Sequence, residues 1–285
     1  MSDNIDLSGI KMIVTDMDGT FLKDDNSFHY SRFQSQLEKL KAKGIHFVVA
    51  TGRQYRGTTH LFGDLVEDIT FITDNGSFIT KQNHVLLKKV MPVYQVKEIV
   101  RQLNRYGLRE YVLSGRKHAY IDHGFVKEDF VNQIKHYYQG IRDINEGYET
   151  DDIFKLTIRA QRGEEFFLLK EIGASLEFPF VPVSSGYEFL DLISPEINKA
   201  TAIRVVQDKY HVMDHEIAVF GDSNNDIEML SAYEHSFAVD NAPETIKQYA
   251  SFTALSNNKE GVLSMIDVFL GDEKEKCYGR LYRRN

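Results

Sequence analysis

Two carboxylates separated by one methionine follow a short apolar run near the start of the chain. The run is Ile10–Val14, and the next residues read TDMDGT, with Asp16 and Asp18 as the acids. A carboxylate can attack phosphorus and form an aspartyl phosphate. A second carboxylate nearby can protonate the leaving oxygen and later activate water. Gly19 permits a turn that would bring both acids to one pocket, and Thr20 can hydrogen-bond within that turn.

Three later segments also place polar residues where chemistry could use them. They supply Thr51, Gly52 and Arg53 in ATGR, Lys199 in NKATA, and Asp222, Asn225 and Asp226 in GDSNND. In an open parallel sheet, ligands bind beyond the carboxyl ends of the strands. We therefore expect these side chains to meet Asp16 and Asp18 at one crevice.

The pooled set of side chains fits metal-assisted phosphoryl transfer. Carboxylates held close together repel one another and need a cation. Oxygen ligands without His or Cys suit Mg²⁺, which commonly binds substrate phosphate. Lys199 and the backbone amides of Thr51 and Gly52 would hold the remaining phosphate oxygens. Positioning and charge neutralisation are the main needs of this reaction.

Composition narrows the class of protein. The chain has 285 residues, 42% of them hydrophobic and 27% charged, and a formal net charge of -8. This charge argues against nucleic acid as a partner, but local cations can still hold an anionic small substrate. The single cysteine, Cys277, excludes an internal disulfide and a Cys-rich zinc site. We see neither a signal peptide nor an apolar run of membrane-spanning length, so we expect a cytoplasmic protein without a membrane partner.

Strand-like and helix-like segments alternate at both ends of the chain. Short apolar runs predict buried parallel strands at 10–16, 44–52, 69–76 and 216–222. Periodic apolar residues predict helices at 31–44, 198–212, 224–234, 243–250 and 260–270. Together they predict an α/β fold, a doubly wound and mostly parallel sheet built from both ends of the chain.

The middle of the chain loses this regular alternation. Helices are expected at 93–107 and 164–176, and strands at 109–115, 117–123, 153–160 and 188–194. Some of these strands alternate in the way of a sheet with one exposed face. We therefore predict an α+β cap inserted at 84–187, with a catalytic core formed by 1–83 and 188–285.

The motifs DMDGT, ATGR, NKATA and GDSNND, in this order and spacing, resemble those of the haloacid dehalogenase-like (HAD) superfamily. The pattern is most similar to the Cof-type phosphatase branch, which carries a large α/β cap of type IIB. DNG at 74–76 and NAPETIKQYA…SNNKEGVLSMI near the end also resemble that branch, so the resemblance covers nearly the whole chain. Two departures are Ala200 and Ser223, where glycine is common, and neither position has a chemical role.

The resemblance implies a role for each matching residue. Asp16 would be the nucleophile and a Mg²⁺ ligand, and Asp18 the general acid/base whose backbone carbonyl also binds the metal. The remaining roles are phosphate binding by the Met17 amide, Thr51, Gly52 and Asn225, charge stabilisation by Lys199, metal ligation by Asp222, metal support by Asp226, and substrate contact by Arg53 and Asn75. The implied function is Mg²⁺-dependent hydrolysis of small phosphomonoesters, such as sugar phosphates, through an aspartyl phosphate.

Other interpretations stay open. Singly, the acids could be helix caps or turn residues, and Lys199 a solvated helix lysine. The same motifs also occur in phosphosugar mutases and phosphotransferases, and could serve a regulator that only binds a phosphorylated ligand or a phospho-accepting signalling domain. Aromatic residues such as Tyr94, Tyr137 and Tyr138 are expected to pack, and His118 and His123 to lie on the surface of the insertion.

The leaving group of the substrate is not specified by the motifs. Sugar phosphates, phosphorylated sugar alcohols, pyridoxal phosphate and flavin-pathway phosphates all remain candidates. Residues 184–188, at the return to the core, are a candidate substrate contact, and the basic tail from 274 to 285 is expected to be solvated or packed against a partner. The oligomeric state is left open.

Overall fold

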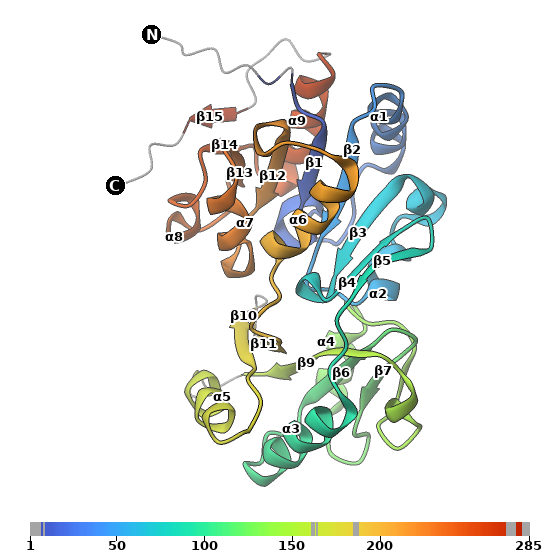
Figure 1. Cartoon of the computed structure of the whole chain (residues 1–285), viewed down its shortest axis with the longest axis vertical. Coiled ribbons are helices and arrows are strands. Elements are labelled where there is room, and N and C mark those ends of the chain that lie inside the picture. Colours follow the sequence, from blue (N-terminus) through green and yellow to red (C-terminus); the bar gives the residue numbers. More distant parts are fainter. Residues whose placement is uncertain are drawn as a thin grey trace.

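The computed structural model describes residues 7, 9–160, 163, 165–184 and 188–271, and the backbone of 278–280. It contains two β-sheets, one with nine strands and one with six. Figure 1 shows the larger sheet in the blue, cyan, orange and red parts of the chain and the smaller one in the green and yellow parts. The residues of both chain ends thus share one sheet, and the middle of the chain forms the other.

The nine-stranded sheet has a parallel centre with antiparallel edges. In spatial order its strands are β15 (Tyr278–Arg280), β14 (Phe252–Ala254), β13 (His235–Val239), β12 (Ile217–Gly221), β1 (Met12–Thr15), β2 (His46–Ala50), β3 (Ile69–Thr73), β4 (Phe78–Lys81) and β5 (His84–Lys88). All four residues of β1 are buried, as expected for a central strand covered on both faces. The predicted doubly wound α/β core is confirmed.

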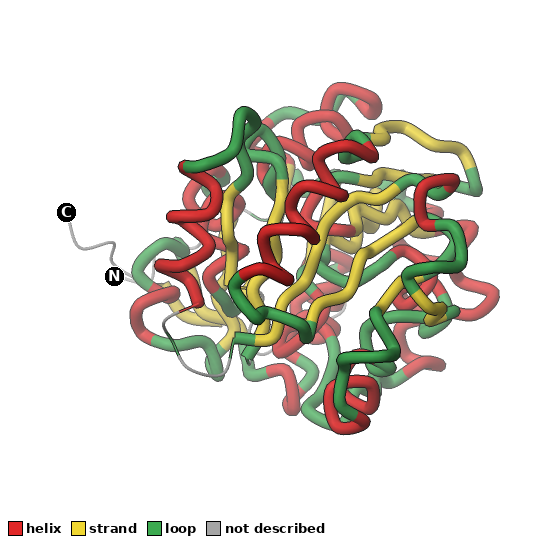
Figure 2. The backbone as a smooth tube through the Cα atoms, turned by 90° about the horizontal axis from the view of Figure 1, so that it is seen from below, coloured by secondary structure: helices red, strands yellow, loops and turns green. Residues whose placement is uncertain are grey.

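Helices flank the strands of this sheet (Figure 2). They are α1 (Tyr30–Ala42), α2 (Tyr55–Thr59), α6 (Lys199–Tyr210), α7 (Ile227–Ala232), α8 (Glu244–Lys247) and α9 (Gly261–Leu270). Helix α1 shows why the sequence folds in this way. Phe33, Leu37 and Leu40 form its buried stripe, and Gly44, just beyond the helix, adopts a left-handed φ of +71° that few other residues tolerate.

The six-stranded sheet belongs to the cap and is mostly antiparallel. Its spatial order is β10 (Val181–Ser184), β11 (Phe189–Ile193), β9 (Ile153–Arg159), β6 (Tyr111–Gly115), β7 (Ala119–Ile121) and β8 (Ile141–Asp143). The cap helices are α3 (Val93–Arg105), α4 (Glu128–Ile134) and α5 (Glu165–Ala174). No helix among the described residues is both long and apolar enough to cross a membrane.

Sheet membership shifts both predicted domain boundaries toward the C-terminus. Strand β5 pairs with β4 in the core sheet, although 84–88 was assigned to the cap. Strand β11 pairs with β9 in the cap sheet, although 189–193 was assigned to the core. The first error arose because β4 and β5 form a hairpin at Gln82 and Asn83, both with positive φ, without the glycine that usually marks such a turn.

Candidate active site

Three adjacent core strands end at one cavity. Strands β12, β1 and β2 are neighbours in the sheet, and Asp222, Asp16 and Thr51 follow them directly. The cavity has a volume of about 260 Å³ and is lined by both core and cap residues. The crevice expected from the sequence is therefore present, and the cap forms its opposite wall.

The turn after β1 brings Asp18 and Thr20 back toward the sheet. Gly19 has a φ of +75°, and a Cβ on it would lie 2.6 Å from Asp222 Oδ2. Thr20 Oγ1 donates a hydrogen bond of 2.6 Å to Asp222 Oδ1. The glycine is thus required both for the turn and for the close approach of the two segments.

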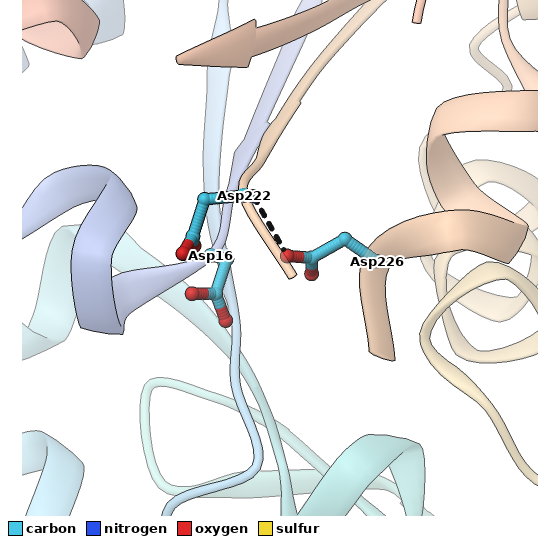
Figure 3. Close-up of side chains that lie close together, drawn as sticks. All are labelled: Asp16, Asp222 and Asp226. Carbon is cyan, nitrogen blue, oxygen red and sulfur yellow. Dashed lines mark hydrogen bonds between the residues drawn. The ribbon is translucent and has the colours of Figure 1, made fainter. Parts of the chain in front are cut away.

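Asp16, Asp222 and Asp226 form a cluster of acids at the strand ends (Figure 3). One carboxylate oxygen from each lies within 4.8 Å of the others. Asp226 Oδ2 accepts hydrogen bonds from the backbone amides of Asp222, at 2.9 Å, and Ser223, at 3.0 Å. These bonds fold the GDSNND segment so that both of its acids face Asp16.

Lys199 lies buried between two of these acids. Helix α6 begins at this residue, and Asn198 caps the helix by accepting a hydrogen bond from the Thr201 amide. The Lys199 ammonium donates to Asp16 Oδ1 and, at 2.6 Å, to Asp226 Oδ1. Burial acts to lower the pKa of Lys199, but the two carboxylates outweigh it and raise the pKa above its usual value. The ammonium therefore stays charged at neutral pH.

The acid cluster fits a hard divalent cation. Burial raises the pKa of Asp16 well above its usual value, although Lys199 opposes the shift. Burial also raises the pKa of Asp222 to about 7, and the neighbouring Asp226 adds to this. One lysine thus leaves this cluster with unbalanced negative charge. A cation would relieve it, and an all-oxygen donor set suits Mg²⁺.

Arg53 binds the Asp18 carboxylate beside the acid cluster through two hydrogen bonds. The guanidinium donates to Asp18 Oδ2 through Nε at 2.8 Å and to Oδ1 through Nη2 at 2.5 Å. It also donates to the His136 carbonyl of the cap at 2.9 Å and lies 4.9 Å from the centre of the Tyr137 ring. Arg53 was predicted to meet the substrate. The structure shows it as a buried link between Asp18 and the cap that also lines the cavity.

The residues expected to bind phosphate lie beside the acids. Thr51 and Gly52 follow β2, and a Cβ on Gly52 would lie 3.0 Å from Asn75 Oδ1 and 3.7 Å from Asn225 Nδ2. Glycine thus leaves space among these polar groups. The Met17 side chain is buried in the hydrophobic core, so its backbone is the part left for a ligand.

Asn75, which was expected to contact substrate, is almost completely buried. It is 2% exposed, and its Nδ2 donates to Asp191 Oδ2 at 2.6 Å. Within the described residues its Oδ1 has no hydrogen-bond partner. Asp74, Asn75 and Gly76 all have positive φ. The DNG segment is therefore a strained turn that also carries a polar group toward the Gly52 loop.

The cap contributes side chains that the sequence did not single out. Lys155 and Thr157 on β9 and Asp191 on β11 line the cavity opposite the acid cluster. Tyr137 and Tyr138 were predicted to pack. Tyr138 belongs to a hydrophobic cluster and Tyr137 packs against it, and both residues also line the cavity. The available signal was the lysine and the threonine that interrupt the apolar residues of IFKLTI, at 153–158.

Core and cap meet closely along the start of α2. Gln54 is buried, with its Nε2 donating to the Gly115 carbonyl at 2.8 Å and its Oε1 accepting from the Gln139 amide at 3.0 Å. Its side chain therefore joins the core to the end of cap strand β6 and to the loop that follows α4.

Some predicted features are not covered by the structure. Of the candidate segment 184–188, residues 185–187 lie outside the described residues, as do Cys277 and most of the basic tail. The metal-ligand set needs no histidine, and His118 and His123 do not line the cavity.

Two similar sequences and one similar solved structure match this chain over nearly their whole length. The protein YbjI of Escherichia coli, named a 5-amino-6-(5-phospho-D-ribitylamino)uracil phosphatase, is 32% identical over 93% of this chain and 97% of its own. YitU of Bacillus subtilis bears the same enzyme name and is 24% identical over 90% of this chain and 97% of its own. The crystal structure of SMU.1108c from Streptococcus mutans UA159 matches with a TM-score of 0.84 and 32% identity over 92% of this chain and 99% of that chain.

A family match agrees with the resemblance seen in the motifs. The family model described as haloacid dehalogenase-like hydrolase matches residues 13–266, which include the acid cluster, Lys199 and the cap. The chain therefore belongs to the haloacid dehalogenase-like hydrolases.

Proposed function

We propose that this hydrolase is a Mg²⁺-dependent phosphatase that acts on small phosphomonoesters through an aspartyl phosphate on Asp16. The observation that carries the proposal is that Asp16 contacts Lys199 and clusters with Asp222 and Asp226 at the wall of the cavity between core and cap. This arrangement suits a nucleophile whose charge is held by cations until substrate arrives.

Each residue would have a defined part in the two steps. Asp16 attacks phosphorus, the bond to the leaving oxygen breaks, and Asp18 gives that oxygen its proton. Asp18 then takes a proton from a water molecule that attacks the same phosphorus, which frees phosphate and restores Asp16. Lys199 and the amides of the Thr51–Gly52 loop stabilise charge on the phosphoryl oxygens.

The metal would be held by Asp16, Asp222 and the Asp18 carbonyl, with Asp226 supporting them. When bound, Mg²⁺ supplies charge neutralisation for the phosphoryl group and for the crowded carboxylates. Arg53 keeps Asp18 facing the cavity through its paired hydrogen bonds. The cap excludes bulk water, which strengthens every electrostatic contact inside.

The names of the relatives suggest the first substrate to test. YbjI and YitU are named for 5-amino-6-(5-phospho-D-ribitylamino)uracil, and we propose this compound as the leading candidate. Ile134, Tyr137 and Phe189 form an apolar wall of the cavity that could contact a flat ring. Polar residues form another wall that could contact hydroxyl groups.

The test is phosphate release from this compound and a panel of phosphorylated metabolites. Wild type and Asp16→Asn are compared with Mg²⁺ and with chelator. We expect release that depends on Mg²⁺ and is lost in the variant. An isomerised sugar phosphate in place of free phosphate would instead show a mutase, and a folded, Mg²⁺-binding protein that turns over none of the panel would support a regulator.

A further inference from the structure

A buried lysine of the cap faces the cavity with hydrogen-bonding capacity to spare. Lys155 is 3% exposed, and its Nζ donates to Asp191 Oδ2 at 2.7 Å. An ammonium carries three N–H donors. Among the described residues, Asp191 is the one hydrogen-bond acceptor that Lys155 has. Its other N–H groups are therefore available to a ligand. Lys155 lines the cavity, where a bound ligand could accept hydrogen bonds from them.

Asp191 fixes where this ammonium lies. Its Oδ1 accepts from Thr157 Oγ1 at 2.5 Å, and its Oδ2 accepts from Asn75 Nδ2 at 2.6 Å as well as from Lys155. Tyr138 shares a hydrogen bond of 2.7 Å with Thr157, so the phenol can donate to the threonine while the threonine donates to Asp191. The carboxylate is fully buried and satisfied, which makes it a positioning residue for Lys155.

This pair lies beside the loop proposed to bind phosphate. A Cβ on Gly52 would lie 3.5 Å from Asp191 Oδ2, the oxygen that also holds Lys155. The unpartnered Oδ1 of Asn75 lies next to the same point, at 3.0 Å. A ligand oxygen close to the ester would thus meet the donors of Lys155, whose partner Asp191 also lines the cavity.

Resting on the proposed phosphatase function, we propose that Lys155 selects substrates by donating a hydrogen bond to a hydroxyl oxygen of the leaving group. Lys155 and Asp191 form a neutral pair, so the subsite favours an uncharged, hydroxyl-bearing chain over a second phosphate or a bare alkyl group. A hydroxyl oxygen can accept from Lys155, which an alkyl chain cannot do, and it adds no charge beside the pair, as a second phosphate would.

The experiment compares ribitol 5-phosphate with n-pentyl phosphate, which has the same carbon chain without hydroxyl groups. We expect wild type to favour the polyol ester in kcat/KM. In Lys155→Met the ratio of the two kcat/KM values should fall by about tenfold to a hundredfold, because the polyol ester alone loses a hydrogen bond. Lys97→Met, at an exposed cap lysine, is the matched control.

A damaged cap would lower turnover of both esters, so the ratio separates recognition from structure. Because Lys155→Met leaves Asp191 without its cation, the double variant with Asp191→Asn provides a neutral version of the subsite, and a melting curve checks that it folds. The inference is overturned if wild type shows no preference for the polyol ester. It is also overturned if Lys155→Met folds and lowers kcat/KM equally for both esters. If wild type releases phosphate from other compounds of the panel but from neither of these esters, this inference is overturned and the phosphatase stands. Release from no compound at all overturns both.

Discussion

Gly57 of the core lies directly against the backbone of Tyr137 in the cap. A Cβ on Gly57 would lie 2.1 Å from the Tyr137 carbonyl oxygen, so no other residue fits while the two domains are in contact. The nearby Gln54 joins the core to the end of β6 and to the loop after α4 in the cap. The close contact of core and cap therefore depends on a position with no side chain.

Gly57→Ala should push the cap away from the core. We expect kcat/KM for the best substrate to fall by about tenfold or more, because the cap wall no longer closes the cavity. Small-angle scattering should show a larger radius of gyration than for wild type. Gly9→Ala, where nothing lies within 4 Å of a built Cβ, is the control; unchanged scattering and activity in Gly57→Ala would contradict this account of the contact.

Lys199→Met should abolish turnover by removing the cation between Asp16 and Asp226. We expect kcat to fall by about a thousandfold, the upper range for loss of one electrostatic contact in an active site. The variant should also melt at a lower temperature without Mg²⁺, because buried carboxylates lose their partner. Activity within tenfold of wild type would show that Lys199 is not part of the reaction.

The motifs at the strand ends could be predicted because their signals are local. A buried strand followed by Asp16 or Asp222 needs only the parallel sheet to bring the acids together, and that sheet could be read from apolar runs. Lys199 could be placed because a capping residue, Asn198, precedes it and fixes the start of the helix.

The cap wall could not be predicted in the same way. In β9 the polar residues Lys155, Thr157 and Arg159 alternate with apolar ones, which predicts a strand with one polar face. Every residue of the strand is nevertheless buried, and the alternation alone does not tell whether the polar face meets solvent or lines a cavity. Asp191 meets Lys155 and Asn75 only through pairings between distant segments. Where the cap lies against the core is decided by packing such as that at Gly57, which leaves no local pattern in the sequence.

The buried carboxyl group of Asp74 should make the free energy of unfolding fall as the pH rises. Burial raises its pKa from 3.8 to about 7, opposed by Lys155 and by hydrogen bonds from Ser114 and Thr73, with Asp191 adding to the rise. Between these values the folded protein keeps a proton that the unfolded chain has lost, so the free energy of unfolding declines over that range.

Asp74→Asn removes this proton uptake. The melting temperature of the variant relative to wild type should therefore rise between pH 5 and pH 8. Each kcal/mol by which the free energy of unfolding of wild type declines corresponds to about 2–4 °C. Thermal melts at several pH values, with Asp64→Asn as an exposed control, measure the slope. A difference that is constant with pH would show that Asp74 is already ionised at pH 5.

Mg²⁺ should stabilise the folded protein through the acid cluster. At a concentration one hundred times its dissociation constant, a ligand that binds the folded state alone adds about 2.7 kcal/mol to the free energy of unfolding. We expect the melting temperature to rise with Mg²⁺ and to return with chelator. The effect should be lost in Asp222→Asn, and a rise of equal size in that variant would place the metal elsewhere.

The most direct test of the central claim is to trap the phosphoryl group on Asp16. Asp18→Asn, which should slow both formation and hydrolysis of the phospho-enzyme, is mixed with substrate and Mg²⁺ and quenched in acid at times from milliseconds to minutes. Its peptides are then analysed by mass spectrometry. The account predicts one added phosphoryl group on the peptide that carries Asp16, absent from the Asp16→Asn variant. Phosphate release with no phosphorylated peptide at any quench time, or turnover retained by Asp16→Asn, would contradict it.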